Sequence, residues 1–96
     1  MATFILLMNF TDQGIRNVKD TLTRFATFRA LIEAQGGTVK SAYWTLGSYD
    51  VIFTVEGTEE SVMTTSLKLG SLGNVRTQTL RGFSADEMKG LISKMP

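Results

Sequence analysis

Two short segments of this sequence are apolar at nearly every position, and they constrain the fold more than any other feature. Residues 4–10 read Phe-Ile-Leu-Leu-Met-Asn-Phe, and residues 51–55 read Val-Ile-Phe-Thr-Val. Successive side chains of a strand point to opposite faces of its sheet, so each segment presents apolar groups to both faces. We therefore expect both segments to be central strands of one sheet.

A helical pattern follows the first of these strands. Apolar residues recur at three- and four-residue spacing over residues 11–36. An unbroken helix of that length would span about 39 Å, whereas an eight-residue strand spans about 27 Å. We therefore expect a break, with Asp20 or Thr21 capping a second, longer helix. Gly36-Gly37 is expected to end that helix in left-handed backbone.

The second half of the chain contains a hairpin and another helix. Residues 38–46 and 49–56 have the composition of strands, and Gly47-Ser48 between them suits a two-residue type II′ turn. Thr58 is placed to cap the helix that follows. The apolar stripe predicted for this helix consists of Val62, Met63, Leu67 and Leu69.

A fourth strand, residues 74–83, leads into a C-terminal helix. Ser84-Ala85-Asp86-Glu87 is a capping box, which marks the first turn of that helix. Residues 1–96 then form one α+β domain with the order strand–helix–strand–strand–helix–strand, plus the final helix. This is the ferredoxin-like βαββαβ order, with an antiparallel sheet whose first and third strands are central.

The two crossover helices of such a fold cover only one face of the sheet, yet the central strands are apolar on both. A large uncovered apolar face is rare on a soluble monomer. Either the C-terminal helix folds over this face, or a second copy of the chain packs against it, sheet to sheet. We favour the second copy, which makes the protein a symmetric homodimer or a larger homo-oligomer.

Several short motifs make the sequence similar to a known family. The motifs are Gly36-Gly37, Leu46-Gly47-Ser48-Tyr49-Asp50, Glu56 and Gly73-Asn74-Val75-Arg76-Thr77. Together they resemble the GYD family of small bacterial and archaeal proteins, and the likeness extends over essentially the whole chain. Gly57-Thr58 departs from the family, which commonly has Ala-Pro there. The resemblance implies a ferredoxin-like fold and dimeric α+β barrel assembly, and it implies no particular activity.

The composition excludes several kinds of chemistry. The chain has neither cysteine nor histidine, which excludes disulfides, thiolate chemistry and haem with a proximal histidine. Acidic residues show no metal-ligand spacing, so we expect neither a metal nor a cofactor. Ten basic against nine acidic residues leave a net charge of +1, without the basic excess of nucleic-acid-binding proteins. No apolar run is long enough for a signal peptide or a membrane span, so we expect a cytoplasmic protein with no membrane partner.

The candidate residues for a small-molecule site are Arg24, Tyr43, Trp44, Tyr49, Asp50 and Arg76. Tyr49 could donate a hydrogen bond and Asp50 could act as a base or bind a cation; alternatively, both could lock the hairpin. The arginines, with Arg81, could bind a carboxylate or phosphate, or form structural ion pairs. Tyr43 and Trp44 point to opposite sheet faces, where they could line a pocket or pack in a core or interface.

Three functions remain open at this point. The first, which we favour, is an oligomeric small-molecule-binding protein with a sensor or accessory role. The second is a cofactor-independent enzyme, monooxygenase- or isomerase-like, by analogy with dimeric α+β barrels. The third is a purely structural oligomer. A cavity walled by Trp44 and Tyr49, with Asp50 or an arginine projecting into it, would favour one of the first two.

Overall fold

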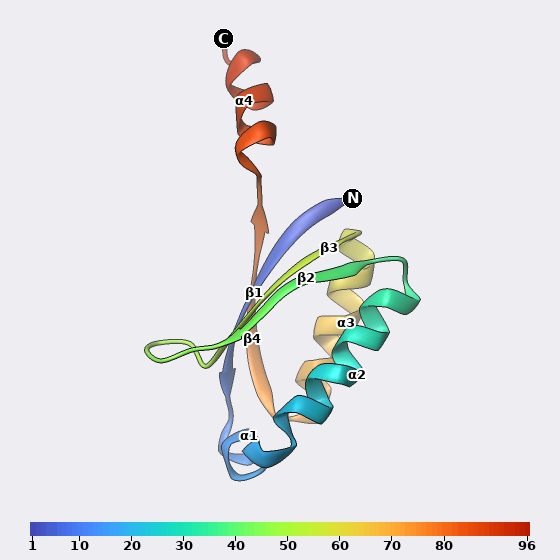
Figure 1. Cartoon of the computed structure of the whole chain (residues 1–96), viewed down its shortest axis with the longest axis vertical. Helices are drawn as coiled ribbons and strands as arrows, with labels where there is room; N and C mark the ends of the chain where they lie inside the picture. Colours follow the sequence, from blue (N-terminus) through green and yellow to red (C-terminus); the bar gives the residue numbers. More distant parts are fainter.

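The computed structural model describes all 96 residues, with a four-stranded antiparallel sheet and two long helices on one of its faces (Figure 1). The strands are β1 (Ala2–Phe10), β2 (Thr38–Trp44), β3 (Val51–Gly57) and β4 (Val75–Gly82). The helices are α1 (Asp12–Arg16), α2 (Thr21–Ala34), α3 (Glu59–Leu72) and α4 (Ala85–Ser93), with a 3-10 turn η1 (Val18–Asp20). The strand order β2-β3-β1-β4 places β1 and β3 at the centre and confirms the predicted ferredoxin-like topology.

The core lies between the sheet and helices α2 and α3. Buried and half-buried positions alternate along β1 and β3, and the buried side chains face the helices. The register places Leu6 of β1 opposite Phe53 of β3. Core side chains are Phe4, Leu6, Met8, Phe28, Ile32, Val51, Phe53, Val55 and Val62. Each of them stabilises the fold by about 1.5–3 kcal/mol through removal from water.

The chain breaks between α1 and α2, where the length argument predicts a break. Asp20 precedes α2, but its side chain accepts no capping hydrogen bond, and Thr21 is already the first helical residue, so neither predicted cap forms. The reason is local: Asp20 belongs to the 3-10 turn, with φ −92° and ψ 5°, whereas a capping side chain needs an extended backbone. The Arg24 guanidinium spans the break instead, because Nη1 donates to the Asn17 carbonyl at 2.8 Å.

Three other predicted helix ends are confirmed. Gly36 follows α2 with φ +83°, the left-handed conformation that glycine adopts without strain. Thr58 caps α3, since its hydroxyl accepts from the Ser61 N–H at 3.1 Å. Ser84 and Glu87 form the capping box of α4. Hydrogen bonding from the Ser84 backbone N–H lowers the pKa of the Glu87 carboxyl, with a smaller contribution from nearby Arg81.

The apolar stripe predicted for α3 is wrong at two positions. Met63 and Leu67 are 58% and 61% exposed, whereas Leu69 is half-buried against the core. The buried positions of this helix are Ser61, Val62 and Thr65. The Thr65 hydroxyl accepts from the Gln35 side chain just after α2, at 3.0 Å. Small hydroxyl-bearing residues therefore join the two helices where larger apolar ones were expected.

The connection between β2 and β3 is longer than predicted. Strand pairing ends at Trp44 opposite Val51, so residues 45–50 form the loop in place of a two-residue turn at Gly47-Ser48. The Thr45 hydroxyl donates to the Tyr49 carbonyl at 2.6 Å. The Thr45 N–H donates to the Asp50 carbonyl at 2.9 Å, so the hairpin is closed by this pair of residues and not by Leu46 and Tyr49.

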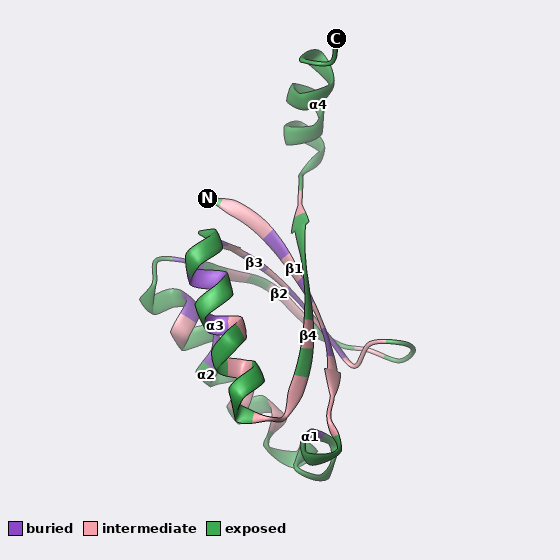
Figure 2. Ribbon diagram, turned by 180° about the vertical axis from the view of Figure 1, so that it is seen from behind, coloured by how far each residue is buried: buried purple, intermediate pink, exposed green.

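The second face of the sheet is uncovered. Helix α4 does not fold over it but projects beyond the end of β4, and all residues of α4 are exposed (Figure 2). The projecting helix raises the Cα radius of gyration to 14.6 Å, against about 12.5 Å for a compact domain of this length. None of the helices is both long and apolar enough to cross a membrane.

Candidate small-molecule site

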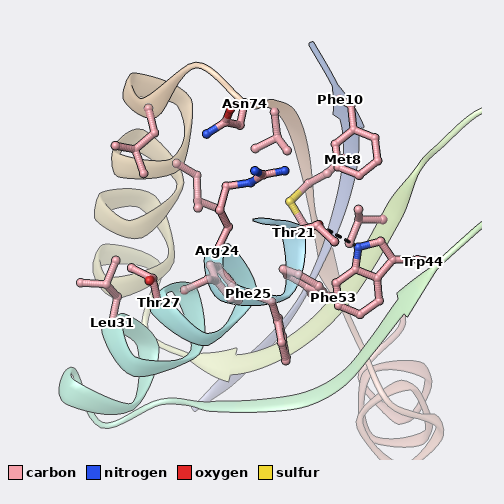
Figure 3. Close-up of a pocket in the computed structure, with 15 residues that line it drawn as sticks. Met8, Phe10, Thr21, Arg24, Phe25, Thr27, Leu31, Trp44, Phe53 and Asn74 are labelled. Carbon is pink, nitrogen blue, oxygen red and sulfur yellow. Dashed lines mark hydrogen bonds between the residues drawn. The ribbon is translucent and has the colours of Figure 1, made fainter. Parts of the chain in front are cut away.

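A pocket of about 100 Å³ opens between the sheet and helices α2 and α3 (Figure 3). Eleven of its 15 lining residues are hydrophobic, so most of a bound group would meet apolar side chains. Met8 of β1 and Phe53 of β3 line it from the sheet, and Phe25 and Leu31 line it from α2. This combination of a concave shape and apolar walls is typical of small-molecule sites.

One wall of the pocket is aromatic and held in place. The rings of Phe25 and Phe53 lie 5.0 Å apart, and the ring of Trp44 meets Phe25 edge to face at 5.7 Å. The Trp44 indole N–H donates to the Thr21 hydroxyl at 3.0 Å (Figure 3). Because Thr21 begins α2, this bond joins the end of β2 to the helix and fixes the indole beside the pocket.

Arg24 is the only charged residue that lines the pocket. Its Nη1 atom is bonded to the Asn17 carbonyl, but its Nη2 atom is buried and has no hydrogen-bond partner. No acidic side chain forms an ion pair with it. Figure 3 shows the guanidinium extending toward the end of the pocket where Asn74 lies. A buried donor without an acceptor costs about 1–3 kcal/mol, and more when it is charged.

Asn74 contributes a second polar group to the same end of the pocket. Its Oδ1 atom accepts from the Gln13 amide at 3.1 Å. This bond orients the Asn74 amide, and its Nδ2 group donates to no other protein group. The pocket therefore has apolar walls and, at one end, hydrogen-bond donors without acceptors.

The six predicted site residues do not come together. Arg24 and Trp44 line the pocket, whereas Tyr43 points to the uncovered face and is 64% exposed. Tyr49 also lies over that face, where its hydroxyl donates to Gln78 of β4 at 2.9 Å. Arg76 pairs in register with Asn9 and is exposed. Of the two residues expected to wall a cavity, only Trp44 lines the pocket, because Tyr49 lies on the other side of the sheet.

Asp50 is bonded to the central strand β1. Its carboxylate Oδ2 accepts from the Phe10 N–H at 2.9 Å, and its own N–H donates to the Met8 carbonyl at 2.9 Å. Of the two interpretations of this residue, the geometry matches the one in which it satisfies backbone donors. The donor belongs to β1, however, and not to the hairpin. Asp50 does not project into the pocket.

Sequence reasoning missed Asn74, Phe25 and Phe53 as site residues. Phe25 and Phe53 belong to the apolar patterns of α2 and β3, and nothing in those patterns distinguishes a pocket wall from a filled core. Asn74 follows Gly73, whose φ of +82° ends α3. A polar residue between a helix end and a strand start is the one signal that could have identified it.

A second, wider groove lies between α3 and β4, with Met63 and Leu67 on one side and Thr77 and Thr79 on its floor. No three acidic, histidine or cysteine side chains come together in a way that could hold a metal ion.

The topology and the pocket define a small ferredoxin-like α+β domain with a partly open apolar pocket beside its sheet. The chain belongs to the GYD domain family, whose family model matches residues 4–92. Among curated proteins, none matches the sequence.

Solved structures with a similar fold include two small proteins. One is the crystal structure of FFRP-DM1, with 24% identity and a TM-score of 0.57, covering 86% of this chain and all of that one. The other is the hypothetical protein PHS023 from Pyrococcus horikoshii, with 24% identity and a TM-score of 0.56, covering 88% of this chain and 92% of that one. At this identity the likeness shows the fold alone, which agrees with the ferredoxin-like topology.

Proposed function

We propose that the protein is a homo-oligomeric module that binds a small organic molecule in the pocket beside Trp44. The observation that carries the proposal is the buried, unbonded Nη2 atom of Arg24 at one end of an apolar pocket. Arg24 as a whole is half-buried, but a buried donor atom without an acceptor is destabilising in a space that serves only as core. Apolar walls with a few fixed polar groups are the usual form of a small-molecule site.

Binding is favoured over catalysis by the chemistry of the pocket. No carboxylate lines it, and Asp50, the proposed base, is engaged with Phe10 of β1. General base catalysis needs a proton acceptor within hydrogen-bond reach of the substrate. The pocket offers donors to a ligand but no group that would take a proton from it.

The second part of the proposal is that another copy of the chain covers the open sheet face. An apolar patch crosses this face through register pairs: Leu80 lies beside Ile5, and Leu7 beside Ile52, which in turn faces Tyr43. The outer members, Tyr43 and Leu80, are 64% and 39% exposed. Exposed apolar groups on the open face of a sheet are typical of a protein–protein contact.

Helix α4 adds to this contact in the proposed dimer. A four-stranded face about 19 Å wide and 25 Å long offers roughly 475 Å². A stable interface usually buries about 800 Å² on each partner. Met88, Leu91 and Ile92 of α4 are exposed, and the helix itself projects away from the sheet (Figure 1). Their contact with that copy would supply the remaining area.

The pocket can be tested by filling it. Thr27 lines the pocket from α2, whereas Thr23 lies on the same helix and does not. The probe is neutral 3-methylbutan-1-ol, and the readout is the NMR signal of the single indole N–H, that of Trp44. We expect the probe to shift this signal in the wild type and in Thr23→Phe, but not in Thr27→Phe. An equal shift in Thr27→Phe, or none in the wild type, would show that the pocket is not a binding site.

A further inference from the structure

The charge on Arg24 is the strongest clue to the chemistry of a ligand. A guanidinium stays protonated at any physiological pH, and it presents its donors in a planar fork. Here one arm of the fork is bonded to the Asn17 carbonyl and the other, Nη2, faces no acceptor. The acidic residues that form ion pairs, Glu33, Glu56 and Glu87, pair with other cations. The positive charge on the pocket wall is therefore uncompensated within the chain.

The remaining polar groups of the pocket do not supply the missing acceptor. The Thr21 hydroxyl already accepts from the Trp44 indole, and the Thr27 hydroxyl donates to the Thr23 carbonyl at 3.2 Å. Asn74 uses its oxygen for Gln13 and leaves its Nδ2 donors free. A ligand must therefore bring acceptor atoms, and a carboxylate brings two oxygens, one for Nη2 of Arg24 and one for the Asn74 amide.

The size and polarity of the pocket restrict the rest of the ligand. A closed apolar cavity of about 150 Å³ accommodates benzene. The pocket here is about 100 Å³ and open to solvent on one side, so a short branched chain can lie in it with its polar end at the opening. A phosphate would need more donors for its additional oxygens and charge than one guanidinium arm and one amide provide.

We infer that the pocket binds a short aliphatic carboxylate, with its carboxylate on Arg24 and its branched chain against Phe25, Phe53 and Trp44. This inference rests on the binding function proposed above and names the ligand class. The guanidinium selects for the negative charge of the ligand, and the aromatic wall limits the shape of its aliphatic chain. Asn74 donates a further hydrogen bond to the same carboxylate.

Three probes of nearly equal shape test the ligand class: 3-methylbutanoate, 3-methylbutanamide and 3-methylbutan-1-amine. Each is titrated into the full-length protein at neutral pH, and the shift of the Trp44 indole N–H gives the dissociation constant. We expect the carboxylate to bind at least about tenfold more tightly than the amide, since hydrogen bonds to charged groups are the stronger ones. The amine should bind most weakly, because its charge is repelled by Arg24.

Variants assign the effect to Arg24. Arg24→Gln should weaken carboxylate binding to the level of the amide and leave amide binding unchanged. Arg29→Gln is the matched control, since Arg29 lies on the same helix in an exposed ion pair with Glu33 and does not line the pocket. If Arg24→Gln does not fold, as judged by thermal unfolding, Arg24→Lys carries the test. Lysine keeps the charge but not the fork, so a several-fold loss for the carboxylate alone is expected.

The outcomes separate this inference from the function on which it rests. Equal affinity for the carboxylate and the amide would overturn the ligand class, while the pocket would remain a binding site for neutral molecules. Unchanged carboxylate binding in Arg24→Gln would likewise overturn it. If neither the three probes nor 3-methylbutan-1-ol shifted the indole signal, the proposed function would fail together with the ligand class.

Discussion

Gly14 leaves no room for a side chain, so Gly14→Ala is expected to be among the most damaging single changes in this protein. A Cβ atom on Gly14 would lie 1.8 Å from the carbonyl oxygen of Asn74. Both groups belong to the backbone, so α1 and the start of β4 would have to separate. Separation would break the bond from the Thr11 N–H to the Asn74 carbonyl, now 3.1 Å, and the one from the Thr11 hydroxyl to the Gly73 carbonyl, now 2.5 Å.

The size of the effect follows from these contacts. Two hydrogen bonds contribute about 1 kcal/mol each, and overpacking adds about 1–3 kcal/mol of strain. The free energy of unfolding should therefore fall by roughly 3–5 kcal/mol, which corresponds to a decrease in Tm of about 12–40 °C for a domain of this size. Gly70→Ala is the matched control, because nothing lies within 4 Å of its Cβ position in α3. It should raise stability by about 0.5–1 kcal/mol, since alanine favours the helix.

Thermal unfolding followed by circular dichroism measures both variants under the same conditions. The two substitutions are chemically identical, so opposite signs can come only from their surroundings. If the Tm of Gly14→Ala lies within about 3 °C of the wild type, the free energy of unfolding has changed by less than about 1 kcal/mol for a domain of this size. That result would refute the reasoning. It would mean that the close approach of α1 to the Asn74 carbonyl is not needed for folding.

Three further predictions concern the hydrogen bonds of single side chains. Asp50→Ala should lower the free energy of unfolding by about 1–3 kcal/mol, because the Phe10 N–H loses its acceptor; an unchanged denaturation midpoint would contradict this. Tyr49→Phe should lower the free energy of unfolding by less than about 1 kcal/mol in the same assay, because the bond to Gln78 is exposed. A larger loss would contradict the assignment of this hydrogen bond as a weak surface contact. Glu87 has a lowered pKa in the folded state, so its stabilisation of α4 is present above the pKa of the unfolded chain and is lost as pH falls through the folded value. An NMR titration of this carboxyl with a midpoint at or above the ordinary glutamate value would disprove the capping role.

The strand order could be predicted from the sequence because burial leaves a direct pattern. A strand that is apolar on both faces, such as residues 4–10, belongs at the centre of a sheet, whereas the polar strands β2 and β4 belong at its edges. The break after α1 was predictable for a similar reason, since a crossover helix cannot be much longer than the sheet it covers. Helix ends at Gly36, Thr58 and Ser84 depend only on local residues.

Other features depend on contacts between distant parts of the chain and could not be predicted. Asp50 bonds Phe10, which is 40 residues away, and no local pattern in the hairpin indicates that bond. Periodicity gave the spacing of Met63 and Leu67, but not that Ser61 and Thr65 would be the buried positions of α3. The unbonded Nη2 atom of Arg24 is also a product of packing, because the sequence shows an arginine without showing which acceptors its neighbours leave free.

Native mass spectrometry of the purified protein, with and without 3-methylbutanoate, tests the central claim most directly: that copies of this chain associate and that each carries one small-molecule site. We predict a species of twice the 10.6 kDa chain mass, or a higher even multiple, that takes up one carboxylate per chain. A species of 10.6 kDa would contradict the shared sheet interface, and an oligomer that takes up no carboxylate would contradict the site at Arg24.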